Sequence, residues 1–351
     1  MKTEIFGTFG PACAAQETLR QMIDEGMTGM RLNLSHVSLP ASENYINAYK
    51  AAAKTAGVIP QILIDMQGPE LRVGALEAAV SLLEGQIVFL CAMDIYKAGV
   101  DGGIYARVAD IIPVPSEVVD ALQTGDELLL DDGKILLQVT GIASSEGVAT
   151  NKKIVKAEVL RGGILSSGKS IKIKDKYITM SPLTAHDIEN IKLAKAYGVT
   201  ALMQPFVLSG EDLRKVRRVL KEYGADDVQI FAKIENLLGV ENLADILPEA
   251  DVIVIARGDL GNDMPLWELP RVQKQIENAC KKANKPYIVV TQMLASMEQN
   301  PVPTRAEVSD IFHAVYHGAW GVMVTGETAV GKYPVEVIRY LSQTAAQAEI
   351  K

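Results

Sequence analysis

Short apolar runs alternate with amphipathic stretches along most of the chain. Apolar runs bounded by polar residues are typical of buried strands, and apolar positions spaced three and four apart predict helices. The strand pattern occurs in eight segments, at 4–10, 29–34, 61–65, 200–206, 228–234, 252–256, 287–291 and 322–325. A helical pattern follows each of them, as at 16–25, 40–56 and 185–197.

This alternation favours an α/β fold with a parallel sheet. Eight strands with eight helices are the inventory of a closed (β/α)8 TIM barrel, although a doubly wound open sheet alternates in the same way. We expect the barrel, formed by residues 1–68 and 175–351.

The pattern changes between residues 69 and 174. Short apolar pieces are separated there by turn signals such as Gly85, Thr124-Gly-Asp126 and Asp132-Gly133, which is typical of all-β structure. A block of this length is too long for a loop between a strand and a helix. We therefore expect an inserted, β-barrel-like domain after the third strand, placed to act as a lid.

Composition narrows the class of protein. The 351 residues carry a formal net charge of −8, which gives no reason to expect nucleic acid or an anionic membrane as a partner. The three cysteines, Cys13, Cys91 and Cys280, have no CxxC spacing, so neither a disulfide framework nor a zinc site is indicated. With no signal peptide or membrane-spanning run in view, we expect a cytoplasmic enzyme with reduced thiols.

Polar side chains recur at the carboxyl ends of the expected strands, where the ends of parallel strands meet at one mouth. They are Arg31, Asn33, Ser35, Asp65, Lys233, Glu235, Asp259, Thr291 and Glu327. Oxygen ligands such as Glu235 and Asp259 suit Mg²⁺ or Mn²⁺, and Arg31 and Lys233 could neutralise a phosphoryl group. The pattern indicates a site for a metal with an anion.

Several of these residues also have a structural interpretation. A single Lys-Glu pair at a strand end is usually a structural ion pair, and only the recurrence of charges favours catalysis here. Arg257 could hold Asp259 in place or bind a ligand directly. Gly258 could be a turn residue, or its amide could open onto a carboxylate at the start of a short helix. Asp132 is most simply part of a hairpin turn.

The sequence resembles the pyruvate kinases. The segments that carry the resemblance, in the family's order, are 8–12 (TFGPA), 30–36 (MRLNLSH), 65–72 (DMQGPELR), 233–236 (KIEN), 256–261 (ARGDLG), 291–294 (TQML), 303–307 (PTRAE) and 325–328 (TGET). The resemblance covers essentially the whole chain. It implies a barrel with a β lid that passes the phosphoryl group of phosphoenolpyruvate to ADP, yielding pyruvate and ATP.

The resemblance also implies roles for single residues. Glu235 and Asp259 would bind Mg²⁺, Lys233 would stabilise the phosphoryl group in flight, and Arg31 would hold phosphate. The amides of Gly258 and Asp259 would bind the substrate carboxylate.

Further roles implied by the resemblance concern proton transfer and the nucleotide. Thr291 would lie on the face where the enolate is protonated. Arg31 and His36 would lie on the nucleotide side, Lys169 would reach the nucleotide phosphates from the lid, and Asp132 would close over the site.

A K⁺ site is implied at Asn33, Ser35, Asp65 and the carbonyl of Met66. Glu70 matches family members that depend on K⁺, whereas the K⁺-independent members have a lysine at this position. We therefore expect stimulation by K⁺. Arg72 and Glu327 lie within matched segments and complete the set of candidate residues.

The chain departs from the family at several positions. Met66 and Gln67 stand where threonine and lysine are usual, and Thr325 replaces serine. The segment 173–176 (IKDK) replaces a familiar Asn-Leu-Pro stretch, and 204–206 (QPF) ends the fourth strand where small residues and serine are usual. These departures concern lid closure and nucleotide contact.

The chain ends at Lys351, just after the eighth expected helix, where the family continues into a carboxy-terminal α/β domain. That domain carries the sugar-phosphate effector site and one tetramer interface. We therefore expect no such activation, and a homodimer or monomer rather than that tetramer.

Two alternatives to a pyruvate kinase stay open. The same metal site could support enolate chemistry on pyruvate or phosphoenolpyruvate without a nucleotide, which Gln67 favours. The chain could instead be a catalytically weak paralogue that binds phosphoenolpyruvate as a sensor, which the intact Lys233, Glu235 and Asp259 disfavour.

Overall fold

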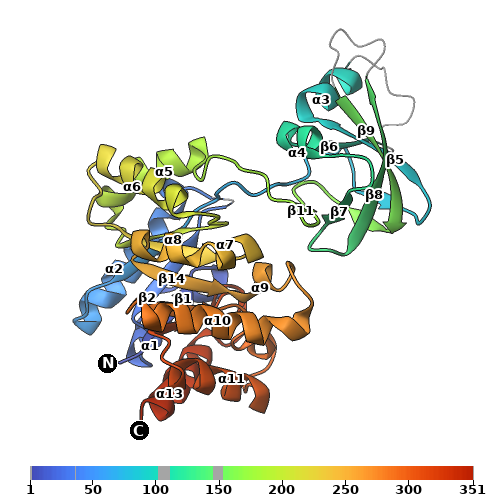
Figure 1. The fold of residues 1–351 in the computed structure, drawn as a ribbon. Helices are drawn as coiled ribbons and strands as arrows, with labels where there is room; N and C mark the ends of the chain where they lie inside the picture. The colour runs from blue at the N-terminus through green and yellow to red at the C-terminus, as the bar shows by residue number, and fades with distance from the viewer. Residues whose placement is uncertain (1, 36, 102–110, 145–152, 351) are drawn as a thin grey trace. The chain divides into compact units, whose positions relative to one another are not determined.

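The computed structural model describes residues 2–35, 37–101, 111–144 and 153–350 (Figure 1). The chain divides into two compact units, Met1–Pro69 with Ser181–Lys351 and Glu70–Met180. The second boundary falls at residue 180, compared with 174 in the sequence expectation. The roles of the two units as catalytic part and lid stay predictions.

The first unit is built on a closed barrel of parallel strands in the order β1-β16-β15-β14-β13-β12-β3-β2. Its strands are β1 (Glu4–Thr8), β2 (Gly29–Asn33), β3 (Gln61–Asp65), β12 (Ala201–Gln204), β13 (Gln229–Ile234), β14 (Val252–Ala256), β15 (Tyr287–Val290) and β16 (Gly321–Met323). The barrel closes where β1 pairs with both neighbours, with Phe6 opposite Gly29 and Met323. This confirms the (β/α)8 barrel over the open sheet.

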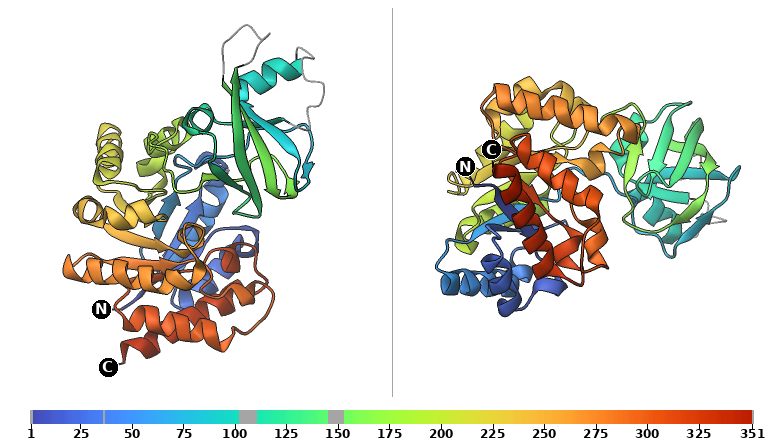
Figure 2. Two further views of the ribbon diagram at one scale, coloured as in Figure 1. Left: turned by 45° about the vertical axis from the view of Figure 1, so that its right-hand side comes forward. Right: turned by 90° about the horizontal axis from the view of Figure 1, so that it is seen from below.

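Helices surround the barrel strands (Figures 1 and 2). They are α1 (Gln16–Asp24), α2 (Glu43–Ala56), α5 (Ala185–Tyr197), α6 (Gly210–Glu222), α7 (Leu237–Glu241), α8 (Leu243–Glu249), α9 (Arg257–Leu260), α10 (Leu269–Lys282), α11 (Arg305–Tyr316), α12 (Gly326–Ala329) and α13 (Pro334–Glu349). Neighbouring helices touch around the ring, as α13 does with α11 and α1. Glu349 accepts a hydrogen bond from the hydroxyl of Thr3 at 2.6 Å, which joins the two ends of the chain.

Two apolar layers hold the barrel together. Side chains on one face of each strand fill the barrel interior, among them Phe6, Leu63, Phe231 and Val254. Side chains on the other face of each strand, such as Ile64, pack between the strands and the helices. Strands buried on both faces explain why the sequence shows continuous apolar runs rather than strict alternation.

A buried carboxylate fixes the point where the chain leaves the barrel. Asp187, in the first turn of α5, accepts hydrogen bonds from the backbone N–H groups of Gln67 and Gly68 at 2.8 and 3.0 Å. The same side chain completes a capping box with Thr184. Gly68 has φ 61°, and a Cβ there would collide with Pro205, so both its conformation and its surroundings require glycine.

The second unit contains a six-stranded sheet in the order β11-β7-β8-β9-β5-β6 and a two-stranded sheet, β10-β4. Its elements are β4 (Val80–Leu82), β5 (Ile87–Ala92), α3 (Met93–Asp101), β6 (Ile111–Val114), α4 (Ser116–Ala121), β7 (Glu127–Leu130), β8 (Ile135–Ser144), β9 (Lys153–Arg161), β10 (Gly163–Leu165) and β11 (Ile171–Ile173). An apolar cluster of its own, including Val88, Leu137 and Val159, forms its core. The expected β insert is confirmed, and it also carries two short helices that the frequent turn signals concealed.

Within the described residues, no helix combines the length and apolarity needed to cross a bilayer. The three cysteines are buried, and none of them takes part in a disulfide with another described residue. Burial raises the pKa of the Cys13 thiol to about 11 and that of Cys280 to about 12, so neither is a reactive thiolate at neutral pH.

Candidate active site

Four charged side chains form a connected network at the carboxyl ends of β2, β3 and β13. The guanidinium of Arg31 donates to Asp65 Oδ2 through Nε at 2.8 Å and through Nη2 at 2.6 Å. Lys233 Nζ lies 3.0 Å from Asp65 Oδ1 and 3.1 Å from Glu235 Oε1. Asp65 therefore joins the two cations that the sequence assigned to phosphoryl binding.

Strand alternation explains why these side chains meet. Asp65 follows Leu63, and Lys233 follows Phe231, at a spacing of two residues, and both Leu63 and Phe231 fill the barrel interior. Arg31 donates at 3.4 Å to the hydroxyl of Thr8 on the adjacent strand. The polar side chains thus continue the inward face of the strands at the point where the apolar layers end.

Burial gives the network its electrostatic character, because Asp65 and Glu235 are only 2% and 3% exposed. Burial alone would raise the pKa of Asp65, but Lys233 and Arg31 hold it below its usual value. Burial would also lower the pKa of Lys233, and the two carboxylates raise it instead, so the ammonium stays charged.

Glu235 differs from Asp65 because its negative charge is only partly compensated. Its pKa is raised to about 7, mainly because of burial, with Lys233 opposing the shift and the charge of Asp259 adding to it. A divalent cation shared with Asp259 would supply the missing positive charge. Two carboxylates form an oxygen donor set that suits Mg²⁺, so the residues present fit this ion.

The segment at the end of β12, the fourth barrel strand along the chain, contacts this network. Phe206 adopts a left-handed backbone, with φ 51°, and its N–H donates to Glu235 Oε2 at 2.8 Å. Gln204 is fully buried and its amide donates to the carbonyl of Pro182 at 2.7 Å. In the segment 204–206, which departs from the family pattern, Phe206 thus supports the carboxylate of Glu235. Gln204 supports the segment at Pro182, where the chain returns to the barrel.

Gly258 and Thr291 lie against each other at the ends of β14 and β15. A Cβ on Gly258 would come within 3.0 Å of Thr291 Cγ2, so the contact leaves little room for a side chain. Asp259 is exposed beside them. The structure thus brings together three residues that the sequence assigned to substrate binding and proton transfer.

Arg257 has partners that the sequence did not suggest. Its Nη1 pairs with Asp310 Oδ2 at 2.7 Å, and its Nη2 donates to the carbonyl of Thr291 at 2.7 Å. Asp310 lies on α11, far along the chain, so no local pattern could have indicated this pair.

Glu327 is a buried carboxylate, 1% exposed, that joins the loops after β15 and β16. It accepts from the N–H of Leu294 at 3.2 Å and from the N–H of Thr325 at 2.6 Å. It also accepts from the hydroxyl of Thr325 at 3.2 Å, and these contacts with the barrel rim indicate a structural contribution to the shape of the mouth.

The residues expected to bind K⁺ lie on adjacent strand ends, where Asn33 is the register partner of Asp65. Asn33 Oδ1 accepts from the N–H of Ser35 at 3.1 Å, and Met66 follows directly after β3. Asp65 Oδ1 accepts a hydrogen bond from Lys233 and retains a lone pair for a further interaction. These neutral oxygens with one carboxylate fit a monovalent cation.

The candidate residues of the second unit form contacts within that unit. Lys169 Nζ pairs with Asp131 Oδ1 at 2.8 Å, next to Asp132 in the turn between β7 and β8. Asp132 accepts from the hydroxyl of Ser170 at 2.8 Å. Glu70 and Arg72 form an ion pair at 2.6 Å. His36, which the sequence places on the nucleotide side, lies outside the described residues.

Over the described part of the chain, no group of three or more His, Cys, Asp or Glu side chains is arranged to hold a metal by itself. A site with two carboxylates falls below that number, and Mg²⁺ usually completes its shell with waters and substrate oxygens. Waters and substrate oxygens would complete the shell of an ion held by Glu235 and Asp259.

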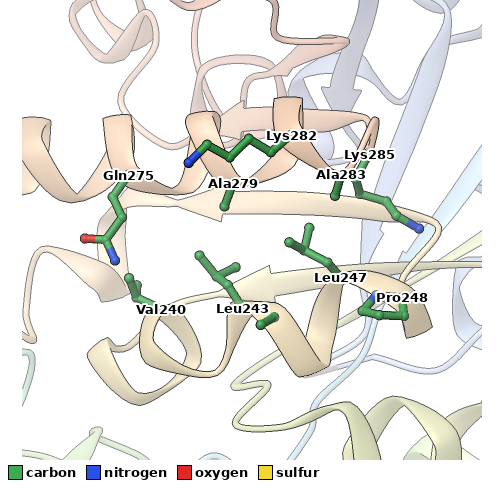
Figure 3. Close-up of a pocket in the computed structure, with 10 residues that line it drawn as sticks. Val240, Leu243, Leu247, Pro248, Gln275, Ala279, Lys282, Ala283 and Lys285 are labelled. Atoms are coloured by element: carbon green, nitrogen blue, oxygen red, sulfur yellow. The ribbon is translucent and has the colours of Figure 1, made fainter.

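A hollow of about 660 Å³ lies on the outside of the barrel, between α8 and α10 (Figure 3). Leu243, Leu247 and Ala279 contribute to its apolar lining, and Lys282 and Lys285 also line it. It contains none of the residues that the sequence singled out. The ammonium of Lys285 is already engaged by the carbonyl of Ala250.

Comparison with known proteins gives the same family as the motifs. The family model for the pyruvate kinase barrel domain matches residues 1–338. This chain belongs to the pyruvate kinase family.

Curated members of the pyruvate kinase family match nearly all of the chain. A pyruvate kinase of Sporosarcina psychrophila is 35% identical over 350 residues, and one of Geobacillus stearothermophilus is 36% identical over 349. A pyruvate kinase of Staphylococcus aureus strain USA300 is 35% identical over 349 residues. Each alignment covers 99% of this chain and 57% of the relative, so the chain spans little more than half the length of these relatives.

Proposed function

We propose that this chain transfers the phosphoryl group of phosphoenolpyruvate to ADP, giving pyruvate and ATP. The observation that carries the proposal is the network at the barrel mouth, in which Lys233 and Arg31 share Asp65 and Lys233 also contacts Glu235. Two cations held beside two carboxylates can bind a phosphoryl group and a divalent cation together. Membership in the pyruvate kinase family supports this reaction.

Within this proposal, Lys233 and Arg31 neutralise the charge of the transferring phosphoryl group. Their ion pairs with Asp65 fix both cations before substrate binds, so little reorganisation is needed during the reaction. Glu235 and Asp259 would hold Mg²⁺, which would supply further positive charge to the site. The amides of Gly258 and Asp259 bind the substrate carboxylate.

Proton transfer and the nucleotide complete the proposed roles. Thr291 lies on the side from which the enolate of pyruvate gains its proton. Arg31, His36, Lys169 and Asp132 contribute to nucleotide binding, and Glu70 is the residue that favours K⁺. A cytoplasmic location, and a homodimer or monomer, belong to the same proposal.

The test is coupled formation of pyruvate from phosphoenolpyruvate and ADP with Mg²⁺, in the presence and absence of K⁺. We expect activity that K⁺ stimulates and that Lys233→Ala lowers by at least about a thousandfold, because the lysine acts on the transferring group. Lys282→Ala, on the outer hollow, is the matched control and should keep the wild-type rate. Equal rates with and without K⁺ would refute the proposed K⁺ site. Wild-type activity in Lys233→Ala would refute the proposed mechanism.

A second function, enolate chemistry without nucleotide, is favoured by Gln67. Its side-chain oxygen accepts from the hydroxyl of Thr184 at 3.1 Å, at a position where the family usually carries a lysine. Under this alternative, the enzyme would exchange the methyl protons of pyruvate with solvent but would form no pyruvate from phosphoenolpyruvate and ADP. The coupled assay and the exchange assay together separate the two functions. Binding of phosphoenolpyruvate without either activity would instead favour the sensor.

A further inference from the structure

Two consecutive residues after β15 have a left-handed backbone. Thr291 has φ 81° and Gln292 has φ 56°, and neither is glycine. A β-branched residue such as threonine is a genuine outlier in this region because its side chain crowds the backbone. Such a conformation persists only where surrounding contacts hold it, and it tends to occur at functional sites.

The guanidinium of Arg257 is placed to hold this conformation. Arg257 directly follows β14, and its Nη2 donates to the carbonyl of Thr291 at 2.7 Å. The same guanidinium pairs through Nη1 with Asp310 on α11 at 2.7 Å. The Arg257 side chain is only 13% exposed, whereas that of Asp310 is 36% exposed. Two neighbouring elements thus fix the carbonyl of the strained residue.

This backbone conformation decides where the Thr291 side chain lies. With Arg257 on its carbonyl, Thr291 packs its methyl group against Gly258, the residue that follows Arg257 in the chain. A shift of the Thr291 backbone would therefore move its hydroxyl relative to the amide that is proposed to bind the substrate carboxylate. The guanidinium reaches Asp310 through one nitrogen and the Thr291 carbonyl through another, in a fixed planar geometry that the single nitrogen of a lysine does not reproduce.

We propose that Arg257 and Asp310 are positioning residues that hold Thr291 for the proton-transfer half of the reaction. In this half, the methylene carbon of the pyruvate enolate gains a proton, and the reverse step exchanges a methyl proton of pyruvate with solvent. The inference rests on the proposed function. It adds a residue on α11 that need not touch the substrate and acts through Arg257.

The experiment compares Asp310→Ala and Arg257→Lys with the wild type in two assays. The first is the coupled assay, which gives kcat and the KM for phosphoenolpyruvate. The second is deuterium incorporation into the methyl group of pyruvate in D₂O with Mg²⁺ and K⁺, followed by NMR. Asp310→Ala places a strong helix former within α11, so the helix should be retained.

We expect both variants to lose about tenfold in deuterium exchange and in kcat, because a small displacement of a positioned group is costly to the rate. The KM for phosphoenolpyruvate should stay within about twofold, since Arg257 acts on Thr291 and not on the bound phosphate. Asp310→Glu, which restores the carboxylate, should recover most of the exchange rate. Glu268→Ala is the matched control, because it removes an exposed pair with Arg271 of the same 2.7 Å length.

Three results would overturn the inference. One is an exchange rate in Asp310→Ala equal to that of the wild type. Another is a rise in the KM for phosphoenolpyruvate that accounts for the whole loss of activity in the variants. That result would assign Arg257 and Asp310 to substrate binding. The third is an equal loss in Glu268→Ala, which would show a general effect of removing an ion pair. A wild-type protein inactive in both assays would instead refute the proposed function itself.

Discussion

Asp65 is the residue on which the charge balance of the barrel mouth depends. It lies between Arg31 and Lys233, both of which are mostly buried. A buried cation that loses its partner is strongly destabilised, because it has left water without gaining a compensating charge. The structure therefore gives Asp65 a role in stability that is separate from any part in K⁺ binding.

We expect Asp65→Ala to lower the free energy of unfolding by about 3 to 5 kcal/mol, the range found when one partner of a buried pair is removed. Urea denaturation would measure the change. Asp24→Ala is the control, because it removes a more exposed pair with Arg20, and it should cost less than about 1 kcal/mol. Similar costs for the two variants would show that the mouth is more hydrated than its burial indicates.

The charged residues at the strand ends could be predicted individually because each follows a recognisable strand. Arg31, Asp65, Lys233 and Glu235 do meet, as the strand pattern implied. The contacts of Arg257 and Asp187 could not be predicted, because each depends on the spacing between elements that are distant in sequence. For Arg257, the available signal was its position directly after a buried strand.

Among the elements, α11 shows how a cap can stabilise a functional loop. Thr304 and Glu307 form a capping box at its start, and Glu307 also accepts from the N–H and the hydroxyl of Ser296 at 2.8 and 2.6 Å. Ser296 follows the loop that contains Thr291. The helix start is thereby tied to the rim of the barrel.

We expect Glu307→Gln to lower the free energy of unfolding at pH 7 by about 1 kcal/mol, as for the loss of a helix cap. Burial alone would raise the pKa of Glu307, but hydrogen bonds from Ser296 and Thr304 lower it. A lowered folded-state pKa adds stability above the unfolded value of about 4.3, and this stability is lost as pH falls through the folded value.

The difference between Glu307→Gln and wild type should therefore shrink in denaturation experiments below about pH 4. Glu43→Gln, in the first turn of α2 where Ser42 makes no capping hydrogen bond, should change little at any pH. A difference for Glu307→Gln that stays constant down to pH 3 would contradict the role of the ionised carboxylate.

The order and type of the barrel elements could be predicted with little error, since each strand lies within an apolar run that is followed by a helical pattern. Their ends were less predictable. The expected strand 287–291 stops at Val290, because Thr291 turns into the left-handed region to contact Arg257. The helices α3 and α4 were missed because the turn residues around them dominate the local pattern.

At the scale of the whole molecule, the chain has two separate sets of core residues. Leu137 belongs to the core of the second unit and Ile253 to the core of the barrel, and both are fully buried. A cavity made in one core should therefore act mainly on the unit that contains it.

We expect Leu137→Ala to cost about 2 to 5 kcal/mol and to lower hydrogen-exchange protection within residues 70–180. Protection of the barrel strands should stay near the wild-type value. Ile253→Ala is the reciprocal variant and should reduce protection in the barrel. Loss of protection throughout the chain in both variants would show that the two units unfold as one.

The pairing of β1 with β16 has a consequence for the order of events during synthesis. The first barrel strand to leave the ribosome cannot complete its hydrogen bonds until the last one, Gly321–Met323, has been made. At ordinary rates of translation this interval is on the order of tens of seconds. The described strands of the second unit find their partners within residues 70–180 and can assemble meanwhile. Until β16 arrives, one edge of β1 stays open to strands of other nascent chains, so the yield of folded protein should depend on chaperones that cover it.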